Sequence, residues 1–313
     1  MKQYLTINDL HNVSQVISEA KALKKNQFIH KDLGIHKTLI MLFFNASLRT
    51  RLSTEKAASN LGMDVIILNV SDSWNLEFEN NVIMNFSSSE HIKEAAQTIS
   101  QYGDILAVRA FPTLKDRNED YKDIIINSFK KYANIPIINL ESATAHPLQA
   151  LADAITISEL STVKKPKVVL SWAPHPKSLP QSVPNSFVKM MQQLDVQLSI
   201  VQPKGYELAT KITGDTPIYY SQKEAFENAD FIYAKNWSSY NDYGKVLHEK
   251  TTWKITQDKI KEAKFMHCLP VRRNVVVDDD VLDSKNSIVI QQANNRTFAA
   301  QVVLKKILEN ITS

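Results

Sequence analysis

The sequence contains one cysteine, Cys268, and only six glycines among its 313 residues. A single cysteine excludes an internal disulfide and any zinc site built from several cysteines. The glycines form neither a G-x-G-x-x-G motif nor a Walker lysine loop. The chain therefore has no recognisable motif for a dinucleotide or for ATP, and no cofactor is predicted.

Long apolar runs and long basic runs are also missing. No apolar stretch is long enough to span a membrane, and residues 1–6 lack the apolar segment of a signal peptide. The net charge of +4 is modest and is not gathered into one basic segment, which argues against nucleic-acid binding. A chain of 313 residues, 43% of them hydrophobic, is typical of a globular protein of about two domains, which we expect in the cytoplasm.

Residues 47–51, Ser-Leu-Arg-Thr-Arg, lie between two contrasting segments. The apolar run at 38–44 predicts a buried strand, and residues 52–61 have a helical pattern. A turn into a helix directs N–H groups and the positive end of the helix dipole at a ligand, and Arg49 and Arg51 add guanidiniums that match phosphate oxygens. We therefore predict an anion site. The alternative is a capped helix with a solvated basic first turn.

The first half of the chain alternates between apolar and helical segments. Strands are predicted at 38–44, 64–70, 104–111 and 135–140, and helices at 6–23, 91–101 and 147–160. Such alternation predicts a parallel sheet covered on both faces, whose ligands bind at the carboxyl ends of the strands. Ser47, Arg49, Arg109 and the segment after Leu140 lie at that edge. The polar loop at 71–89 is long enough to be a binding element.

A second alternating set follows a polar boundary at 161–166. Its strands are predicted at 167–172, 196–201, 231–235, 265–268 and 287–291, and the last helix at 296–310. The predicted fold class is therefore α/β, with two doubly wound domains that each contain a parallel sheet and with a cleft between them.

Two histidine motifs stand near the ends of predicted strands. His146-Pro147-Leu148-Gln149 places a histidine and a glutamine on one helical face, where both can address one carbonyl oxygen; the alternative is a helix cap with a surface histidine. In His267-Cys268-Leu269-Pro270 the proline predicts extended backbone whose carbonyls accept from a ligand amide. Cys268 alone is better explained as a small buried hydrophobe than as a nucleophile.

The conjunction of these motifs is more specific than any one of them. In chain order stand Phe43-x-x-x-Ser47-x-Arg49-Thr50-Arg51, Arg109, His146-Pro147-x-Gln149, His267-Cys268-Leu269-Pro270 and Arg296. Over essentially its whole length the chain resembles the aspartate/ornithine transcarbamylase family. The resemblance implies a carbamoyl phosphate domain at 1–145, an amine-substrate domain at 146–292 and a C-terminal helix at 293–313 that packs back on the first domain. It also implies a homotrimer with sites shared between subunits, and neither metal nor cofactor.

The resemblance assigns a role to each motif residue. The phosphate would be bound by Ser47, Arg49, Thr50, Arg109 and the amides of the turn, Leu48 included. The carbamoyl oxygen would be polarised by Thr50, Arg109 and His146, and the carbamoyl NH2 end held by Gln149, Cys268, the Leu269 carbonyl and Arg296. When an amine attacks the carbonyl, negative charge grows on that oxygen and on the leaving phosphate, and fixed cations and N–H donors there lower the barrier. No protein nucleophile is required.

The amine substrate is implied by the second domain. The chain lacks the Asp-containing stretch and the Ser-Met-Gly loop of the ornithine branch, and it resembles the branch that uses N-acyl-L-ornithine, in its succinyl-using form. An acylated α-nitrogen carries no charge and needs no acidic partner. Lys235 and Arg272 would then bind carboxylates, Glu141 and His175 would complete the pocket, and the proline-rich stretch 174–184 would thread a knotted domain.

Trp74 and Glu90 resemble residues that a neighbouring subunit inserts into the site, Trp74 beside carbamoyl phosphate and Glu90 beside the acyl group. At the position of Glu90 the acetyl-using branch has glutamate, whereas the succinyl-using branch has proline. A glutamate carboxylate there would repel the carboxylate of a succinyl group. Glu90 therefore predicts N-acetylornithine on a succinyl-type scaffold. The alternatives are that Glu90 caps the helix from His91 and that Trp74 only fills a trimer interface.

The predicted reaction is transfer of the carbamoyl group to the δ-amine of an N-acyl-L-ornithine, which gives N-acylcitrulline and phosphate in arginine biosynthesis. Two rivals stay open: a transcarbamylase for ornithine or aspartate, and a catalytically silent, anion-sensing family member. The intact motif set argues against the second. Asp278, Asp279 and Asp280 are interpreted as the acidic start of a helix and not as metal ligands.

Overall fold

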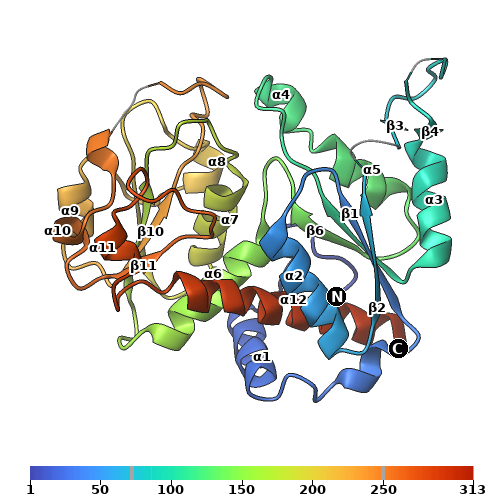
Figure 1. The fold of residues 1–313 in the computed structure, drawn as a ribbon, viewed down its shortest axis with the longest axis horizontal. Coiled ribbons are helices and arrows are strands. Elements are labelled where there is room, and N and C mark those ends of the chain that lie inside the picture. The colour runs from blue at the N-terminus through green and yellow to red at the C-terminus, as the bar shows by residue number, and fades with distance from the viewer. Residues whose placement is uncertain (71–73, 86, 248–250, 313) are drawn as a thin grey trace. The chain divides into compact units, whose positions relative to one another are not determined.

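The computed structural model describes residues 1–70, 74–85, 87–247 and 251–312 (Figure 1). The chain divides into two compact units. Unit 1 comprises Met1–Pro112, Asn118–Leu148 and the chain from Arg296 onward, and unit 2 comprises Thr113–Arg117 and Gln149–Asn295. Within the described residues, no helix is both long and apolar enough to cross a bilayer.

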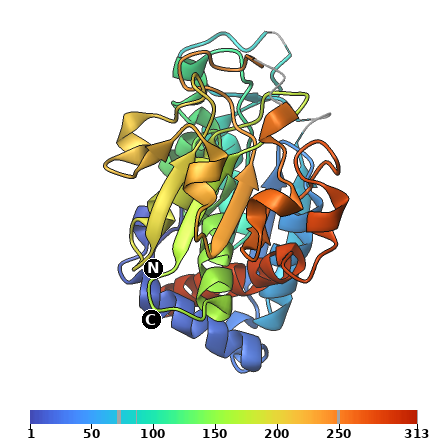
Figure 2. The same cartoon turned by 90° about the vertical axis from the view of Figure 1, so that its left-hand side faces the viewer.

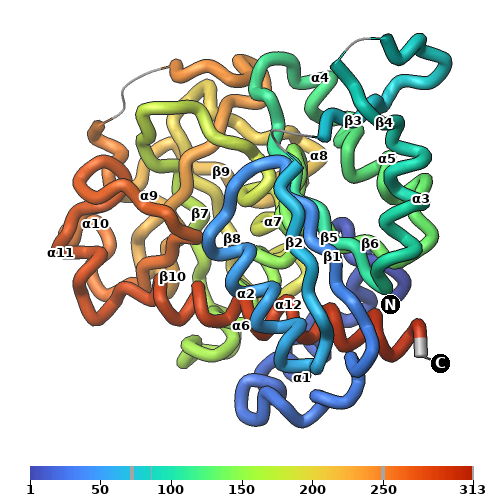
Figure 3. Tube along the Cα trace, turned by 45° about the vertical axis from the view of Figure 1, so that its right-hand side comes forward, coloured from blue at the N-terminus to red at the C-terminus, as the bar shows by residue number. Residues whose placement is uncertain are grey.

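The sheet of unit 1 is parallel and has the strand order β2-β1-β5-β6 (Figure 3). Its strands are β1 (Thr38–Phe43), β2 (Asp64–Asn69), β5 (Ile105–Arg109) and β6 (Ile137–Glu141). Ile40 and Leu42 pack on one face against α3 (Ile92–Tyr102) and α5 (Ile124–Tyr132), and the alternate residues Leu39 and Met41 are fully buried as well. Burial of both faces explains why the sequence of β1 is continuously apolar.

Three more helices complete unit 1. Asn60 of α2 (Leu48–Asn60) donates to Gln301 Oε1 of α12 (Val289–Thr312) at 2.9 Å, and Lys306 of α12 pairs with Glu19 at 2.9 Å. The helix expected at 6–23 divides into a 3-10 turn, Ile7–Asp9, and α1 (Val13–Lys25). The division occurs because the Asn12 side chain accepts from Gln15 N and caps a new helix.

The loop expected at 71–89 contains more structure than predicted. Leu76–Glu77 (β3) pairs in parallel with Glu90–His91 (β4); positions 71–73 and 86 of that loop lie outside the described residues. His91, not Glu90, is the N-cap of α3, and its Nδ1 accepts from Lys93 N at 3.2 Å. The alternative interpretation of Glu90 as the cap of this helix is therefore wrong.

The sheet of unit 2 is also parallel, with the order β11-β10-β7-β8-β9 (Figure 2). Ile232 of β10 packs with residues of α9, α10 and α11, while its neighbour Tyr233 points to the other face and meets Phe187 of α7 at 4.6 Å between ring centroids. Helices on both faces confirm the doubly wound class in this unit. The elements are β7 (Lys167–Trp172), β8 (Gln197–Val201), β9 (Ile218–Tyr219), β10 (Phe231–Lys235), β11 (Lys264–Met266), α6 (Pro147–Leu160), α7 (Ser182–Met191), α9 (Gln222–Phe226), α10 (Gln257–Ile260) and α11 (Asp279–Leu282). Short pieces complete the chain at Lys31–Gly34 (η2), Arg117–Asp120 (α4), Thr210–Thr213 (α8) and Thr251–Trp253 (η3).

The strand predicted at 287–291 is wrong. Ser287 forms only an isolated bridge to Phe265, and α12 begins at Val289, seven residues before the predicted helix start at Arg296. The short apolar run Ile288-Val289-Ile290 fits a buried strand and a buried helix equally well, because periodicity cannot separate the two over so few residues.

Candidate functional site

The predicted residues fall into two groups, one in each unit. Unit 1 holds Ser47, Leu48, Arg49, Thr50, Trp74, Glu90, Arg109, Glu141, His146 and Arg296, and unit 2 holds Gln149, His175, Lys235, Cys268, Leu269 and Arg272.

The predicted strand–turn–helix is confirmed at residues 38–60. β1 ends at Phe43, and Ser47 is the N-cap of α2, where its Oγ accepts from Thr50 N at 3.3 Å. α2 starts at Leu48, earlier than expected, so that Arg49 and Thr50 stand in its first turn. Thr50 is buried, Arg49 is half-buried and Leu48 is exposed. N–H groups of a first helical turn and a neighbouring guanidinium are suited to bind an anion.

Arg109 lies at the carboxyl end of β5 and is buried. Its NH1 donates to Asn45 O at 3.0 Å and to Ala46 O, and its NH2 donates to Glu141 Oε2 at 3.1 Å. The ladder between β5 and β6 shifts register after Val108, which sets Arg109 opposite Glu141. A buried guanidinium so held is a rigid cation directly ahead of the α2 turn.

Glu141 contacts a second predicted residue. Its Oε2 lies 3.6 Å from His146 Nε2, and both side chains are buried. The segment between them is held by Asp123, whose carboxylate accepts from Ser142 Oγ at 3.0 Å, from Ala143 N at 2.8 Å and from Thr144 Oγ1. Burial raises the pKa of the Asp123 carboxyl, and these donors oppose the rise. Asp123 could not be predicted from the sequence, because nothing in its spacing ties it to residues 142–144.

Arg296 reaches the α2 turn from the far end of the chain. Its NH2 donates to Thr50 Oγ1 at 2.6 Å across 246 positions of sequence. Both side chains are buried. Thr50 therefore has a cation beside its hydroxyl, and the start of α2 receives guanidiniums from both β5 and α12.

In unit 2 the residues of the two histidine motifs are joined by buried hydrogen bonds. Gln149 Nε2 donates to Asp153 Oδ1 at 2.7 Å, Gln292 Nε2 donates to the same oxygen at 2.7 Å, and His267 N donates to Gln292 Oε1 at 2.9 Å. Asp153 and Gln292 were not among the residues predicted from the sequence. The available signal for Asp153 was a carboxylate one turn after Gln149 in a mainly apolar stretch of α6. Gln292 was missed because the adjoining residues 287–291 were predicted to be a strand and not the start of α12.

The turn after β11 differs from its prediction. Leu269 is not extended but has a left-handed φ of 55°, and its peptide bond to Pro270 is cis. Leu269 N donates to His267 Nδ1 at 2.9 Å, a local bond that extended backbone could not make. Cys268 is half-buried, and Leu269 and Pro270 follow it toward the surface.

A cationic cluster lies at the ends of β7 and β10. Arg272 Nε donates to His175 Nε2 at 3.0 Å, and Lys235, which is buried, donates from Nζ to Asn236 O at 2.9 Å. His175 Nδ1 is 2.8 Å from Lys177 O. The pKa of His175 is lowered, first by burial and then by the charges of Lys235, Arg272 and Lys177, against the opposing bond to Lys177 O. Because Arg272 Nε donates to Nε2, the neutral ring accepts at that nitrogen.

Trp74 and Glu90, which are 16 positions apart, are joined directly. Trp74 Nε1 donates to Glu90 Oε2 at 2.6 Å, and both side chains are partly buried beside the β3–β4 pair. The sequence predicted a separate role for each of these residues and no bond between them. The bond fixes one carboxylate oxygen of Glu90 against the indole.

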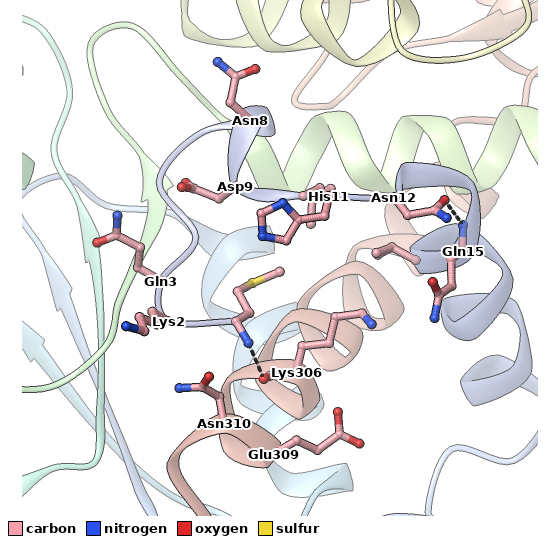
Figure 4. Close-up of a pocket in the computed structure, with 13 residues that line it drawn as sticks. Lys2, Gln3, Asn8, Asp9, His11, Asn12, Gln15, Lys306, Glu309 and Asn310 are labelled. Carbon is pink, nitrogen blue, oxygen red and sulfur yellow. Dashed lines mark hydrogen bonds between the residues drawn. The ribbon is translucent and has the colours of Figure 1, made fainter. Parts of the chain in front are cut away.

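A cavity of about 790 Å³ in unit 1 is lined by none of the predicted site residues (Figure 4). Met1 lines it and donates from its amine to Lys306 O at 3.1 Å, and Lys306 Nζ is paired with Glu19. Among the described residues, no group of three or more His, Cys, Asp or Glu side chains could hold a metal ion. The helix-start interpretation of residues 278–280 is confirmed, since Asp278 is the N-cap of α11.

Comparison with known proteins gives two family matches. Residues 2–159 match the family described as aspartate/ornithine carbamoyltransferase, carbamoyl-P binding domain, and residues 180–307 match its Asp/Orn binding domain. Together the two matches cover most of the chain.

Individual relatives are similar over nearly their full length. The N-succinylornithine carbamoyltransferase of Bacteroides fragilis (strain 638R) is 47% identical over 99% of this chain and 100% of its own length. The N-acetylornithine carbamoyltransferase of Xylella fastidiosa (strain Temecula1) is 33% identical over 97% of this chain and 98% of its own length. A similar solved structure is a glutamate-to-serine variant of N-acetyl-L-ornithine transcarbamylase in complex with carbamyl phosphate and N-succinyl-L-norvaline. It has a TM-score of 0.91 and 30% identity, and the match covers 98% of this chain and 100% of that chain.

Proposed function

Because this chain belongs to the aspartate/ornithine carbamoyltransferase family, we propose that it transfers the carbamoyl group of carbamoyl phosphate to the δ-amine of an N-acyl-L-ornithine. The products are N-acylcitrulline and phosphate. The observation that carries the proposal is the convergence of two buried guanidiniums on one turn: Arg109 donates to the carbonyls of Asn45 and Ala46, and Arg296 donates to Thr50.

Unit 1 would bind carbamoyl phosphate at this turn. The phosphate would lie against the first N–H groups of α2, Ser47, Arg49 and Arg109, since helix N-termini and arginine forks both suit phosphate oxygens. Thr50 and His146 would donate toward the carbamoyl oxygen. All these donors stabilise charge that grows during amine attack, on the carbonyl oxygen and on the leaving phosphate, which can take the proton of the amine.

Unit 2 would bind the acylornithine through its cationic cluster. Lys235 and Arg272 are set to pair with a carboxylate, and His175, which accepts from Arg272 Nε, is neutral in the free protein. Nothing acidic is needed at the α-nitrogen, which is neutral once acylated. Gln149, Cys268 and the Leu269 carbonyl would hold the carbamoyl NH2 group.

The acyl group would be acetyl rather than succinyl. Of the two relatives, the one with the higher identity is named N-succinylornithine carbamoyltransferase. In this chain, however, Glu90 presents a carboxylate that Trp74 holds in place. A fixed negative charge disfavours the free carboxylate of a succinyl group and tolerates acetyl. It is consistent with this that a variant of the acetylornithine enzyme lacking one glutamate was solved with an N-succinyl ligand.

The function is tested by product formation from carbamoyl phosphate with ornithine, N-acetylornithine and N-succinylornithine offered separately. We expect N-acetylornithine to give the highest kcat/KM. Preference for succinyl would contradict the role of Glu90 but not the reaction, and preference for ornithine would contradict the acylornithine assignment. Absence of amine-dependent phosphate release with all three would favour a silent, anion-binding protein.

The pKa of His175 provides a direct test of the carboxylate site. It is lowered in the free protein because burial and three neighbouring cations disfavour the protonated ring. A bound carboxylate adds negative charge and should raise the pKa, so that the complex takes up a proton and the ligand binds more tightly as pH falls through the new pKa. We expect this rise in an NMR titration of the His175 ring with N-acetyl-L-norvaline. His175→Asn identifies the signal, and an unchanged pKa would place the carboxylate elsewhere.

A homotrimer is proposed from exposed apolar side chains. β2 is an edge strand, and Ile66 and Leu68 are 42% and 40% exposed on it; Leu48 and Leu52, one turn apart on α2, are 66% and 58% exposed. Such residues on an edge strand and on a helix that contacts it suit a subunit interface.

Leu52→Asp should therefore dissociate the assembly. Burying a carboxylate in an apolar interface is costly, so we expect the mass measured by light scattering to fall from three chains to one. Val163→Asp is the matched control, because Val163 is also an exposed apolar residue, at 48%, but belongs to unit 2, whereas β2 and α2 belong to unit 1. A monomeric wild-type protein, or a trimeric Leu52→Asp variant, would contradict this interface.

A further inference from the structure

The two substrate-facing segments of unit 2 are connected by one buried carboxylate. Asp153 lies on α6, one helical turn after Gln149, and is fully buried. Its Oδ1 accepts from Gln149 Nε2 and from Gln292 Nε2, both at 2.7 Å. Distances this short are typical of hydrogen bonds to a charged acceptor.

Gln292 continues the connection to the strand end. It lies in the first turn of α12, is fully buried, and accepts at Oε1 from His267 N at 2.9 Å. The His267 ring in turn accepts from Leu269 N at 2.9 Å. Three hydrogen bonds therefore lead from Asp153 to the backbone of Leu269, whose carbonyl is proposed to face the carbamoyl NH2.

The carboxylate decides the direction of every amide in this series. An ionised carboxylate can only accept, so each glutamine must turn its NH2 group toward Asp153 and its carbonyl oxygen away. For Gln292 the outward oxygen meets His267 N–H. For Gln149 the outward atom is also an acceptor, which is the group needed to receive a hydrogen bond from the two N–H donors of a carbamoyl NH2.

We infer that Asp153 is a positioning residue, with Gln292 as its bridge, that makes the site selective for the NH2 of carbamoyl phosphate. The inference rests on the proposed function. Without the carboxylate, Gln149 is able to reverse its amide and present NH2 to NH2, which repels the substrate. Asp153 itself touches no substrate atom in this scheme; it acts through Gln149 and, by way of Gln292 and His267, through Leu269.

Asp153→Asn is the direct test, because asparagine has nearly the same shape but offers both a donor and an acceptor. Two ligands are compared in the full-length enzyme: carbamoyl phosphate as substrate, and acetyl phosphate, which carries CH3 in place of NH2, as a competitive inhibitor. We expect kcat/KM for carbamoyl phosphate to fall about 10- to 100-fold, the usual effect of one charge-assisted hydrogen bond. The inhibition constant of acetyl phosphate should change less than about threefold, because it has no NH2 for Gln149 to recognise.

Thr156→Val is the matched control. Thr156 is fully buried on the next turn of α6, donates to Ala152 O at 2.7 Å and accepts from Asn295 Nδ2 of α12 at 2.9 Å. Its loss disturbs the same helix pair but no amide that faces substrate. Thr156→Val should weaken the use of carbamoyl phosphate and the binding of acetyl phosphate by the same factor, or change neither.

The outcomes separate the inference from the function on which it rests. Equal weakening of both ligands by Asp153→Asn would reduce Asp153 to a structural residue and overturn the inference, whereas an inactive wild-type enzyme would overturn the proposed function instead. If Asp153→Asn does not fold, Gln292→Met replaces it. That variant keeps the Gln149–Asp153 bond but frees the His267–Leu269 turn, so we expect a loss of about tenfold for carbamoyl phosphate alone; no selective loss would again overturn the inference.

Discussion

Arg296→Gln is expected to lower kcat/KM for carbamoyl transfer about 10²- to 10³-fold, the usual effect of removing one preorganised donor from developing negative charge. Arg296 donates to Thr50 Oγ1 at 2.6 Å, and both are buried at the start of α2. The substitution removes a fixed cation from the turn and leaves the Thr50 hydroxyl without its charged neighbour. The loss should therefore appear mainly in kcat, since the charge it stabilises develops during reaction.

The control is an equal substitution at a surface arginine. Arg273 is exposed in unit 2 and pairs with Asp279 and Asp283 at 2.9 and 2.7 Å. Exposed pairs of this kind contribute little, so Arg273→Gln should retain wild-type kinetics. Circular dichroism and the Tm of Arg296→Gln show whether the fold is intact. An intact Arg296→Gln enzyme with near wild-type kcat/KM would exclude Arg296 from the site.

Glu90→Pro is expected to reverse the acyl preference, with the ratio of kcat/KM for N-succinylornithine over N-acetylornithine rising about 10²-fold. Placing two carboxylates against each other in a partly buried site costs several kcal/mol, and each 1.4 kcal/mol is about tenfold. The Trp74–Glu90 bond keeps the charge from turning away, so the penalty cannot be relieved by rotation of the side chain. Proline removes both the charge and the bond.

Two further variants separate charge from backbone at this position. Glu90→Gln keeps the shape and the acceptor for Trp74 Nε1 but carries no charge, so it should raise the same ratio without altering β4. Glu79→Ala removes an exposed carboxylate from the same segment and should leave the ratio unchanged. If Glu90→Gln left the preference for acetyl intact, charge at Glu90 would not set the choice, and the pocket of unit 2 would have to determine it.

Most of the fold could be predicted because its signals are local. β1 is apolar along its whole length since both of its faces are covered, and the Ser47 turn and α2 follow within a few residues. Strand, cap and helix each depend on side chains one to four positions apart. The two parallel sheets follow from repetition of this pattern.

Prediction failed where a short segment satisfies two local patterns or where a partner is distant. Residues 287–291 are apolar enough for a strand, yet Val289 begins α12. The extended backbone expected at Leu269 is replaced by a left-handed turn, because its N–H meets the His267 ring. Asp123 could not be found at all, since its partners at 142–144 lie on another loop.

The sequence by itself determined the two-domain α/β class and the family, and it predicted the site residues of each motif and a conflict between Glu90 and its scaffold. These features depend on residue types and on spacings of a few positions, which are read directly from the sequence. The tertiary structure alone decided which groups meet: Arg296 with Thr50, Trp74 with Glu90, and Gln149 with Gln292 through Asp153. Such pairs depend on how helices and strands pack, and a hydrogen bond across 139 or 246 positions leaves no periodic mark in the sequence between its ends.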